Sequence, residues 1–243
     1  MKEEKEKKMR LDKYLAQMQA GSRSQVKNLI RKKLVTVNGE IVLRPEYPVK
    51  AGEDRIMVQG KEIFYTKTEY YMLNKPAGVV SATRDHREKT VLDLIESKIR
   101  GDLFPVGRLD KDTEGLLLIT NDGELAHRLL SPKKHVDKVY FAKVKGRVTA
   151  QDGEKFAEGL NIGDDKSCLP ATLIIQKTGE ISEVEIKIQE GRYHQIKRMF
   201  QAVDKEVVYL KRLSMGSLKL DGRLKPGEYR LLTTDEIERL KSI

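Results

Sequence analysis

The first sixty residues show two different spacings of apolar positions. Segments 9–18 and 22–33 carry apolar residues three and four positions apart, and this spacing predicts two short helices. Ser22 stands directly before the second of these segments, and Gln25 follows three residues later. This is the pattern of a capping box, in which the two side chains close the start of a helix.

The next segment, LVTVNGEIVL at 34–43, changes to alternation of β-forming residues around Asn38 and Gly39. Asn-Gly between two such runs is a strong sequence signal for a tight hairpin. Residues 9–59 are therefore predicted to form a small domain of two helices and a hairpin. Residues 56–68 are interpreted as a connector.

From residue 69 onward the pattern predicts an α+β domain. The expected strands are 70–74, 116–120, 138–146, 171–177, 183–189, 206–214 and 228–232. The expected helices are 91–97, 123–131, 152–160, 194–203 and 234–242, the last with Thr233 and Glu236 as a capping box. Short turns join adjacent strands as often as helices do, which favours a mixed, mostly antiparallel sheet flanked by helices.

The net charge of the chain indicates a possible class of binding partner. The chain has 243 residues, 39% of them hydrophobic and 35% charged, with a formal net charge of +10. A basic surface favours polyanions, although composition alone leaves nucleic acid and chance basicity equally open. Residues 1–60 hold 14 Lys and Arg against 8 Asp and Glu, and the opening MKEEKEKK is expected to be a solvated tail. Within 23–33 the basic residues are Arg23, Lys27, Arg31, Lys32 and Lys33, with no acid among them.

Several classes are disfavoured by what the chain lacks. Cys168 is the one cysteine, so neither an intrachain disulfide nor a four-cysteine zinc site can form. The sequence shows no membrane-length apolar stretch and no signal peptide. These features predict a cytoplasmic protein with no membrane partner, and we expect a monomer.

Three acids, Asp110, Asp112 and Glu114, stand immediately before an apolar run in GRLDKDTEGLLLITNDGE. Such a placement is costly unless at least one acid is used. A calcium loop would need Glu at its twelfth position, where Asn121 stands. A transition metal would want His or Cys nearby, and the four histidines show no ligand spacing. A two-carboxylate glycosidase site and a purely structural acidic turn both remain open.

Residues 10–42, read as RLDKYLA…GSRSQVKNLIRKKLVTVNGEIV, resemble the S4-type RNA-binding domain. Helix, Gly-Ser turn, basic helix and Asn-Gly hairpin come in the order of that domain. The resemblance implies contact with RNA through the five basic residues of 23–33. It does not by itself imply any catalysis.

The segment GRLDKDTEGLLLITNDG at 107–123 resembles the signature loop of pseudouridine synthases, in the form of the ribosomal small-subunit synthase A branch and its large-subunit relatives. Further segments match in the expected order: LNKPAGVVS (73–81), KVYFAKV (138–144), EGRYHQIKRMF (190–200) and LKRLSMGSLKL (210–220). The resemblance implies that 69–243 form a catalytic domain that isomerises uridine to pseudouridine. It implies neither a metal nor an organic cofactor.

The resemblance also assigns roles to individual residues. Asp110 is the implied catalytic carboxylate, which stabilises positive charge on the sugar, attacks it or removes a proton from it. Lys197 is its expected ion-pair partner, with Arg198 as the main rival and as an RNA contact. Tyr140 is expected to stack on a flipped uracil. Arg108 is expected to hold a phosphate.

The neighbours of Asp110 are assigned supporting roles. Asp112, Thr113 and Glu114 are expected to cap and shape the loop, and Lys75 is expected to shape the sheet without touching substrate. No catalytic role is expected for His194.

The substrate is expected to be ribosomal RNA, and specifically 16S rRNA, free or within an assembling small subunit, because the short N-terminal lead and GRYHQIKRMF are most similar to the small-subunit branch. The same reaction on 23S rRNA is the alternative within the class. A non-catalytic rRNA-binding assembly factor is a second alternative, and a hydrolase that releases free base is a third.

Overall fold

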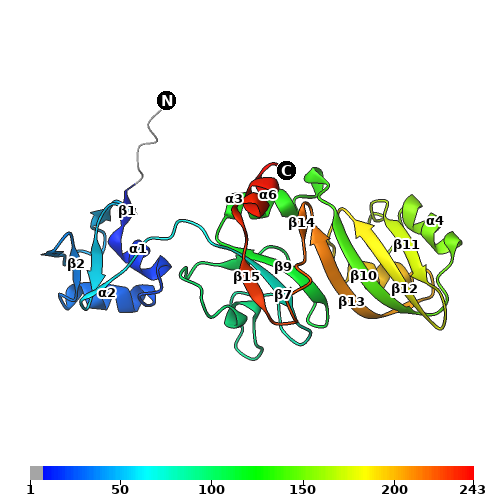
Figure 1. Ribbon diagram of the computed structural model, residues 1–243, viewed down its shortest axis with the longest axis horizontal. Coiled ribbons are helices and arrows are strands. Elements are labelled where there is room, and N and C mark those ends of the chain that lie inside the picture. The colour runs from blue at the N-terminus through cyan, green and yellow to red at the C-terminus, as the bar shows by residue number, and fades with distance from the viewer. Residues whose placement is uncertain (1–7) are drawn as a thin grey trace. The chain divides into compact units, whose positions relative to one another are not determined.

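The computed structural model describes residues 8–243, so the charged tail expected at residues 1–8 lies outside the described residues except for Lys8. The chain divides into two compact units (Figure 1). The first contains the described residues up to Glu69 together with Ser97–Leu103. The second contains Tyr70–Glu96 and Phe104–Ile243.

The first unit contains the two predicted helices and the predicted hairpin. Its helices are α1 (Leu11–Gln17) and α2 (Arg23–Arg31). Its strands are β2 (Val35–Val37), β3 (Glu40–Ile41), β5 (Ile56–Val58) and β6 (Lys61–Glu62) in the order β3-β2-β5-β6, with β1 (Met9–Arg10) paired to β4 (Pro48–Val49). The capping box is confirmed, since Ser22 and Gln25 exchange backbone–side-chain hydrogen bonds of 2.8 and 3.3 Å.

The interpretation of 56–68 as a connector is wrong. Strands β5 and β6 lie within it and form a second hairpin, whose turn residues Gln59 and Gly60 have φ of 50° and 78°. Ile56 is fully buried and Val58 is 7% exposed, and both pack into the core of this unit. The apolar alternation was too short, and Gln-Gly too weak a turn signal, to reveal the hairpin from sequence.

Segment 97–103 packs against α1. The amide of Gly101 donates to the Gln17 carbonyl at 2.7 Å, and the Gln17 side chain donates to Asp102 at 2.9 Å. Arg100 is 3% exposed and donates to the Thr66 carbonyl. The predicted helix at 91–97 is wrong, because only a 3₁₀ turn, Val91–Leu94, forms and the backbone leaves helical geometry at Ile95.

The second unit is built on a nine-stranded sheet with the order β11-β12-β10-β13-β9-β7-β15, with β14 beside β13 and β8 beside β9 (Figure 1). Its strands are β7 (Tyr70–Lys75), β8 (Phe104–Pro105), β9 (Glu114–Thr120), β10 (Lys138–Lys145), β11 (Thr172–Lys177), β12 (Ile181–Ile188), β13 (Glu206–Met215), β14 (Leu218–Lys219) and β15 (Tyr229–Leu231). Among the described strands of this sheet, only β9 and β13 pair in parallel. The predicted α+β class with a mixed, mostly antiparallel sheet is confirmed.

Helices cover this sheet in two places. The buried strands β7 and β9 share a core with α3 (Gly123–Leu130) and α6 (Thr234–Lys241). Farther along the sheet, α4 (Ala150–Glu158) packs against β11 and α5 (Gln195–Gln201) against β13. Phe156 and Phe200 join α4 to α5, with ring centroids 5.0 Å apart. This packing places α5 beside β13, which lies between β10 and β9 in the sheet.

Candidate active site

The loop before β9 carries Asp110 and is fixed from several sides. The Ser81 hydroxyl donates to the Leu109 carbonyl at 2.7 Å and accepts from the Leu109 amide at 3.1 Å. A turn follows, in which the Thr113 amide donates to the Asp110 carbonyl at 3.1 Å. Gly107 precedes the loop with φ of 81°, a backbone conformation that favours glycine. The position of the Asp110 backbone is therefore set before any ligand binds.

Lys75, at the end of β7, supports the same loop from inside. Its ammonium group is fully buried and donates to the carbonyls of Pro76, Lys111 and Thr113 at 3.0, 3.2 and 2.8 Å. Three donors thus meet three acceptors. Burial lowers the pKa of Lys75 to about 8, against the opposing effect of the nearby acids, first among them Asp112. Lys75 acts on the loop and does not line the pocket.

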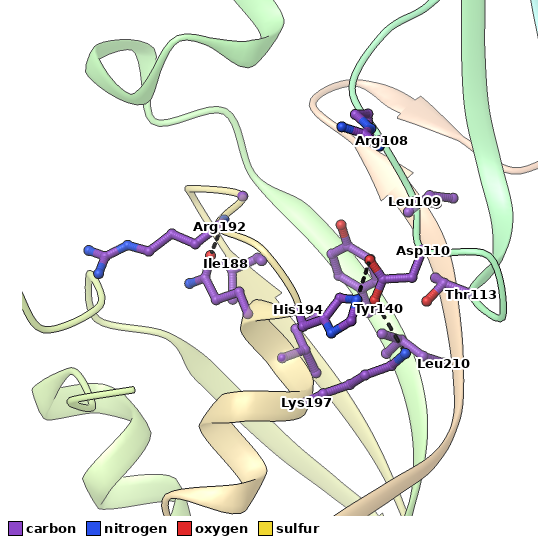
Figure 2. A pocket seen from close by; sticks show the side chains of 13 residues that line it. Arg108, Leu109, Asp110, Thr113, Tyr140, Ile188, Arg192, His194, Lys197 and Leu210 are labelled. Atoms are coloured by element: carbon purple, nitrogen blue, oxygen red, sulfur yellow. Dashed lines mark hydrogen bonds and ion pairs between the residues drawn. The ribbon is translucent and has the colours of Figure 1, made fainter. Parts of the chain in front are cut away.

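Four polar side chains from three parts of the fold converge on one open pocket with a free volume of about 430 Å³. Figure 2 shows Asp110 from the loop, Tyr140 from β10, and His194 and Lys197 from the start of α5 directed toward one another. Of the described residues that line the pocket, Asp110 is the one carboxylic acid. This composition disfavours a two-carboxylate glycosidase site.

Lys197 is shared between two carboxylates. Its Nζ lies 3.3 Å from Asp110 Oδ2, and it donates to both oxygens of Asp112 at 2.7 and 2.8 Å. Burial opposes the charge of Lys197, but the hydrogen bond to Asp112 and the charge of Asp110 outweigh it, so the pKa of Lys197 lies above its ordinary value. The structure thus brings the predicted pair together, but it gives Lys197 a closer partner that the sequence interpretation had assigned to loop capping.

His194 also faces Asp110, with its Nε2 3.6 Å from Asp110 Oδ1. It has φ of 49°, an uncommon backbone conformation for a residue other than glycine. The motif had placed His194 beside the pocket without a catalytic role, and the structure adds its contact with Asp110. Sequence missed Arg192, which lines the pocket and binds Glu190 and the carbonyls of Lys166 and Ser167.

Tyr140 lies on β10 between β12 and β13 and is 7% exposed. Its ring forms part of the pocket wall. Thr113 Oγ1, in the same wall, is buried and has no hydrogen-bond partner among the described residues. The stacking role expected for Tyr140 remains a prediction.

The arginines expected to contact RNA differ in availability. Arg108 is exposed, lines the pocket and forms no ion pair with a described residue, as expected for a phosphate contact. Arg198 is occupied by Asp164 at 2.5 Å and by the Ile162 carbonyl at 2.6 Å. The idea that Arg198 rivals Lys197 as the partner of Asp110 is therefore wrong, and its contact with RNA stays a prediction.

The first unit presents the basic residues of α2 and the turn after it. Arg23, Arg31, Lys32 and Lys33 are exposed and Lys27 is half-buried. Within the described chain, none of the five forms an ion pair. These five residues of α2 and the turn after it, the α2 cations, suit a polyanion, because each neutralised phosphate releases counterions.

The described residues contain no group of three or more His, Cys, Asp and Glu side chains placed to hold a metal ion. They also contain no helix long and apolar enough to cross a membrane.

Comparison with known proteins shows the class of this site. Residues 69–202 match the model of the RNA pseudouridylate synthase family, and residues 9–56 match that of the S4 domain. The chain therefore belongs to the RNA pseudouridine synthases, with an N-terminal S4 domain. These enzymes are intramolecular isomerases that convert uridine to pseudouridine in RNA.

Similar proteins match over nearly the whole chain. An uncharacterized RNA pseudouridine synthase of Bacillus subtilis, YtzG, is 46% identical over 96% of this chain and 98% of its own. Ribosomal small subunit pseudouridine synthase A of Escherichia coli is 41% identical, over 94% of this chain and 98% of its own. Ribosomal large subunit pseudouridine synthase B of Bacillus subtilis is 39% identical, over 96% of both chains.

A solved structure also supports membership of this family. A crystal structure of a pseudouridylate synthase has a TM-score of 0.67 and 39% identity, covering 96% of this chain and 99% of that one.

Proposed function

We propose that this protein isomerises a specific uridine of 16S rRNA, in the cytoplasm, with Asp110 as the catalytic carboxylate, Lys197 as its ion-pair partner and Tyr140 as the base-stacking residue. The observation that carries the proposal is the contact between Asp110 and Lys197 in an open pocket walled by Tyr140. The similarity to small subunit synthase A supports the choice of 16S rRNA.

The chemistry needs one carboxylate. The N1–C1′ bond breaks, the uracil turns, and C5 joins C1′, while the proton lost from C5 is balanced by one gained at N1. Positive charge develops on the sugar, and Asp110 meets it by attack at C1′, by electrostatic stabilisation or by removing a sugar proton. Because the detached base is itself the acceptor, no second carboxylate has to activate a water.

The pocket suits a nucleotide that has left its helix. A base inside folded RNA must be flipped out and held by stacking before its glycosidic bond can be reached. The Tyr140 ring offers a stacking surface in the wall, and the exposed Arg108 at the same pocket offers a charge for the adjacent phosphate. The α2 cations of the S4 unit supply further affinity for RNA that does not depend on base sequence.

Replacing Asp110 by Asn tests the catalytic role. The change keeps the side chain's shape and removes its charge, so we expect isomerisation to fall by at least about a thousandfold. Tritium release from a 16S transcript labelled at uridine C5 measures the reaction, and filter binding should give an RNA Kd within about threefold of the parent. Asp165→Asn, the same change at an exposed acid outside the pocket, serves as the control.

The outcomes separate the candidate classes. Unchanged tritium release by Asp110→Asn would remove Asp110 from its role. A parent protein that binds rRNA without forming pseudouridine would be an assembly factor, and release of free uracil would indicate a hydrolase.

The large-subunit alternative has its own support in the 39% identity to synthase B. Mapping pseudouridines in both rRNAs from cells with and without this protein decides between them. Loss of one pseudouridine from 16S rRNA is expected, and loss from 23S rRNA instead would overturn the substrate assignment.

A further inference from the structure

An exposed aromatic ring lies next to the catalytic pocket. Tyr193 is 76% exposed, and it immediately precedes His194, which lines the pocket and faces Asp110. A tyrosine this exposed contributes little to the stability of a fold, because most of its apolar surface stays in water.

This ring is nevertheless held in a defined position. It stacks on the His194 ring with centroids 3.8 Å apart and planes inclined by 17°. Arg198 donates to the Tyr193 carbonyl at 3.1 Å, and the Arg198 amide donates to the His194 carbonyl at 3.0 Å. The φ of 49° at His194 is set by the same turn into α5. One face of Tyr193 is thus covered by a partner ring, while most of its surface remains open.

We propose that Tyr193 and His194 form a stacking platform for the nucleobase next to the target uridine. The inference rests on the proposed function and adds a second nucleotide to the same site. Flipping one nucleotide leaves its neighbour without a stacking partner. A rigid aromatic surface beside the pocket replaces that partner, and loss of such a surface typically weakens binding by about tenfold or more per base.

The platform predicts a specific effect on the kinetic constants KM and kcat. Every base has a π-face, so the contribution is to affinity for the opened RNA and not to the identity of the neighbouring base. Tyr193 does not touch the reacting atoms, so its loss should raise KM with little change in kcat. A role in holding His194 against Asp110 would instead lower kcat.

The test compares Tyr193→Ala and Tyr193→Phe with the parent in the tritium-release assay. We expect Ala to raise KM about tenfold or more with kcat within about twofold, and Phe, which keeps the ring, to restore the parent KM. Leu231→Ala, at an exposed apolar side chain of the same unit, is the matched control and should change neither constant. Circular dichroism melting should be unchanged in all three.

A direct readout uses an RNA hairpin spanning the mapped uridine, with 2-aminopurine placed on one side of it or the other. In the inactive Asp110→Asn background, binding should quench 2-aminopurine fluorescence at one of the two positions, and adding Tyr193→Ala should abolish that quenching. A parent-like KM for Tyr193→Ala, or quenching that persists in the double variant, overturns the platform while leaving the proposed function intact.

Two further outcomes are informative. Loss of activity on an assembled subunit, but not on naked RNA, would make Tyr193 a protein contact and also overturn the platform. Absence of pseudouridine formation by the parent itself would remove the proposed function, and the platform with it.

Discussion

Two acids of the loop before β9, Asp110 and Asp112, both contact Lys197. Its bidentate contact with Asp112 is shorter than its contact with Asp110, although the Asp112 side chain is 71% exposed and that of Asp110 is 24% exposed. The Lys197–Asp112 pair is thus the shorter of the two contacts, although solvent screens it more strongly than the Lys197–Asp110 pair. We infer that Asp112 positions the ammonium group, and that Lys197 remains the nearest permanent cation to Asp110.

Replacing Lys197 by Met should lower kcat by about a hundredfold or more, because the charge facing Asp110 disappears from a partly desolvated site. Lys197→Arg should recover part of the rate, since it restores the charge with a different geometry. Asp112→Asn should cost less, about three- to thirtyfold, because Lys197 itself remains. Single-turnover tritium release with saturating RNA measures all three, and a larger loss for Asp112→Asn than for Lys197→Met would contradict this order.

Lys75 makes the stability of the protein depend on pH in a defined direction. The pKa of Lys75 is about 8 in the folded protein and near 10.5, its ordinary value, in the unfolded chain. Between these values the unfolded chain binds more protons, so the free energy of unfolding rises with pH. The penalty of burying the charge is complete below pH 8 and fades toward pH 10.5.

Comparing the parent with Lys75→Met isolates this effect, because every other titrating group, including the buried Lys138, is common to both proteins. The free energy of unfolding of the parent should gain roughly 1.5 kcal/mol on the variant between pH 8 and 9.5. Urea denaturation at several pH values measures the difference. Curves that remain parallel over this range would show that Lys75 keeps its ordinary pKa in the folded protein.

Sequence predicted which residues meet in the candidate site better than it predicted their contacts. The motifs named Asp110, Tyr140 and Lys197, and the structure brings the three to one pocket. Contacts between side chains depend on distances across the fold that a linear pattern does not contain. For this reason Asp112 was assigned to loop capping and His194 was given no role, although both lie within 4 Å of the Asp110–Lys197 pair.

At the scale of elements, the candidate site depends on the parallel contact of β9 with β13. Glu114 and Gly115 are opposite Lys211 and Arg212, directly after the loop that carries Asp110. Gly115 has φ of 99°, and a Cβ built there would lie 2.3 Å from the Arg212 carbonyl oxygen. The close approach of these two backbones therefore requires glycine.

Gly115→Ala should destabilise the second unit by about 3 kcal/mol or more, since the methyl group meets backbone and the conformation is strained for any L side chain. Thermal unfolding followed by circular dichroism measures the loss. Gly123→Ala is the matched control, because its added Cβ would meet nothing within 4 Å at the start of α3. The control should be neutral or stabilised by up to about 1 kcal/mol. Equal melting of both variants would show that β9 and β13 can separate without cost.

Elements with local signals were predictable, and those set by distant contacts were not. The capping boxes at Ser22 and Thr233 and the Asn38–Gly39 hairpin form as expected, because each is stabilised by residues close in sequence. Segment 91–97 has helical spacing and a capping box at Thr90, yet it yields four residues of 3₁₀ helix. Four residues gain too few hydrogen bonds to offset helix nucleation, and the following residues pack elsewhere in the fold.

At the scale of the whole molecule, the chain has a net charge of +10, and the α2 cations form no ion pair with a described residue, while many basic residues of the second unit are paired. Arg192, Arg198 and Lys205 each bind an acid. Paired cations are already neutralised and release few counterions when a phosphate arrives. We therefore expect the α2 cations, which lie together on one helix and the turn after it, to account for a large part of the salt dependence of RNA binding.

Changing the five α2 cations, Arg23, Lys27, Arg31, Lys32 and Lys33, to Gln tests this distribution. The plot of log affinity for a 16S transcript against log salt should become shallower by about 3 to 5, close to one for each lost phosphate contact. The kcat at saturating RNA should stay within about twofold, because none of the five lines the catalytic pocket.

The control changes five exposed lysines of the second unit to Gln. None of them forms an ion pair with a described residue, and they are Lys145, Lys155, Lys177, Lys219 and Lys225. It removes the same net charge, so long-range attraction falls equally in both variants. Only direct phosphate contacts can then make the α2 slope the shallower of the two. Equal slopes would mean that the S4 unit acts through long-range electrostatic attraction and not through direct phosphate contacts of α2. The assignment of α2 as the RNA-binding face would then be wrong.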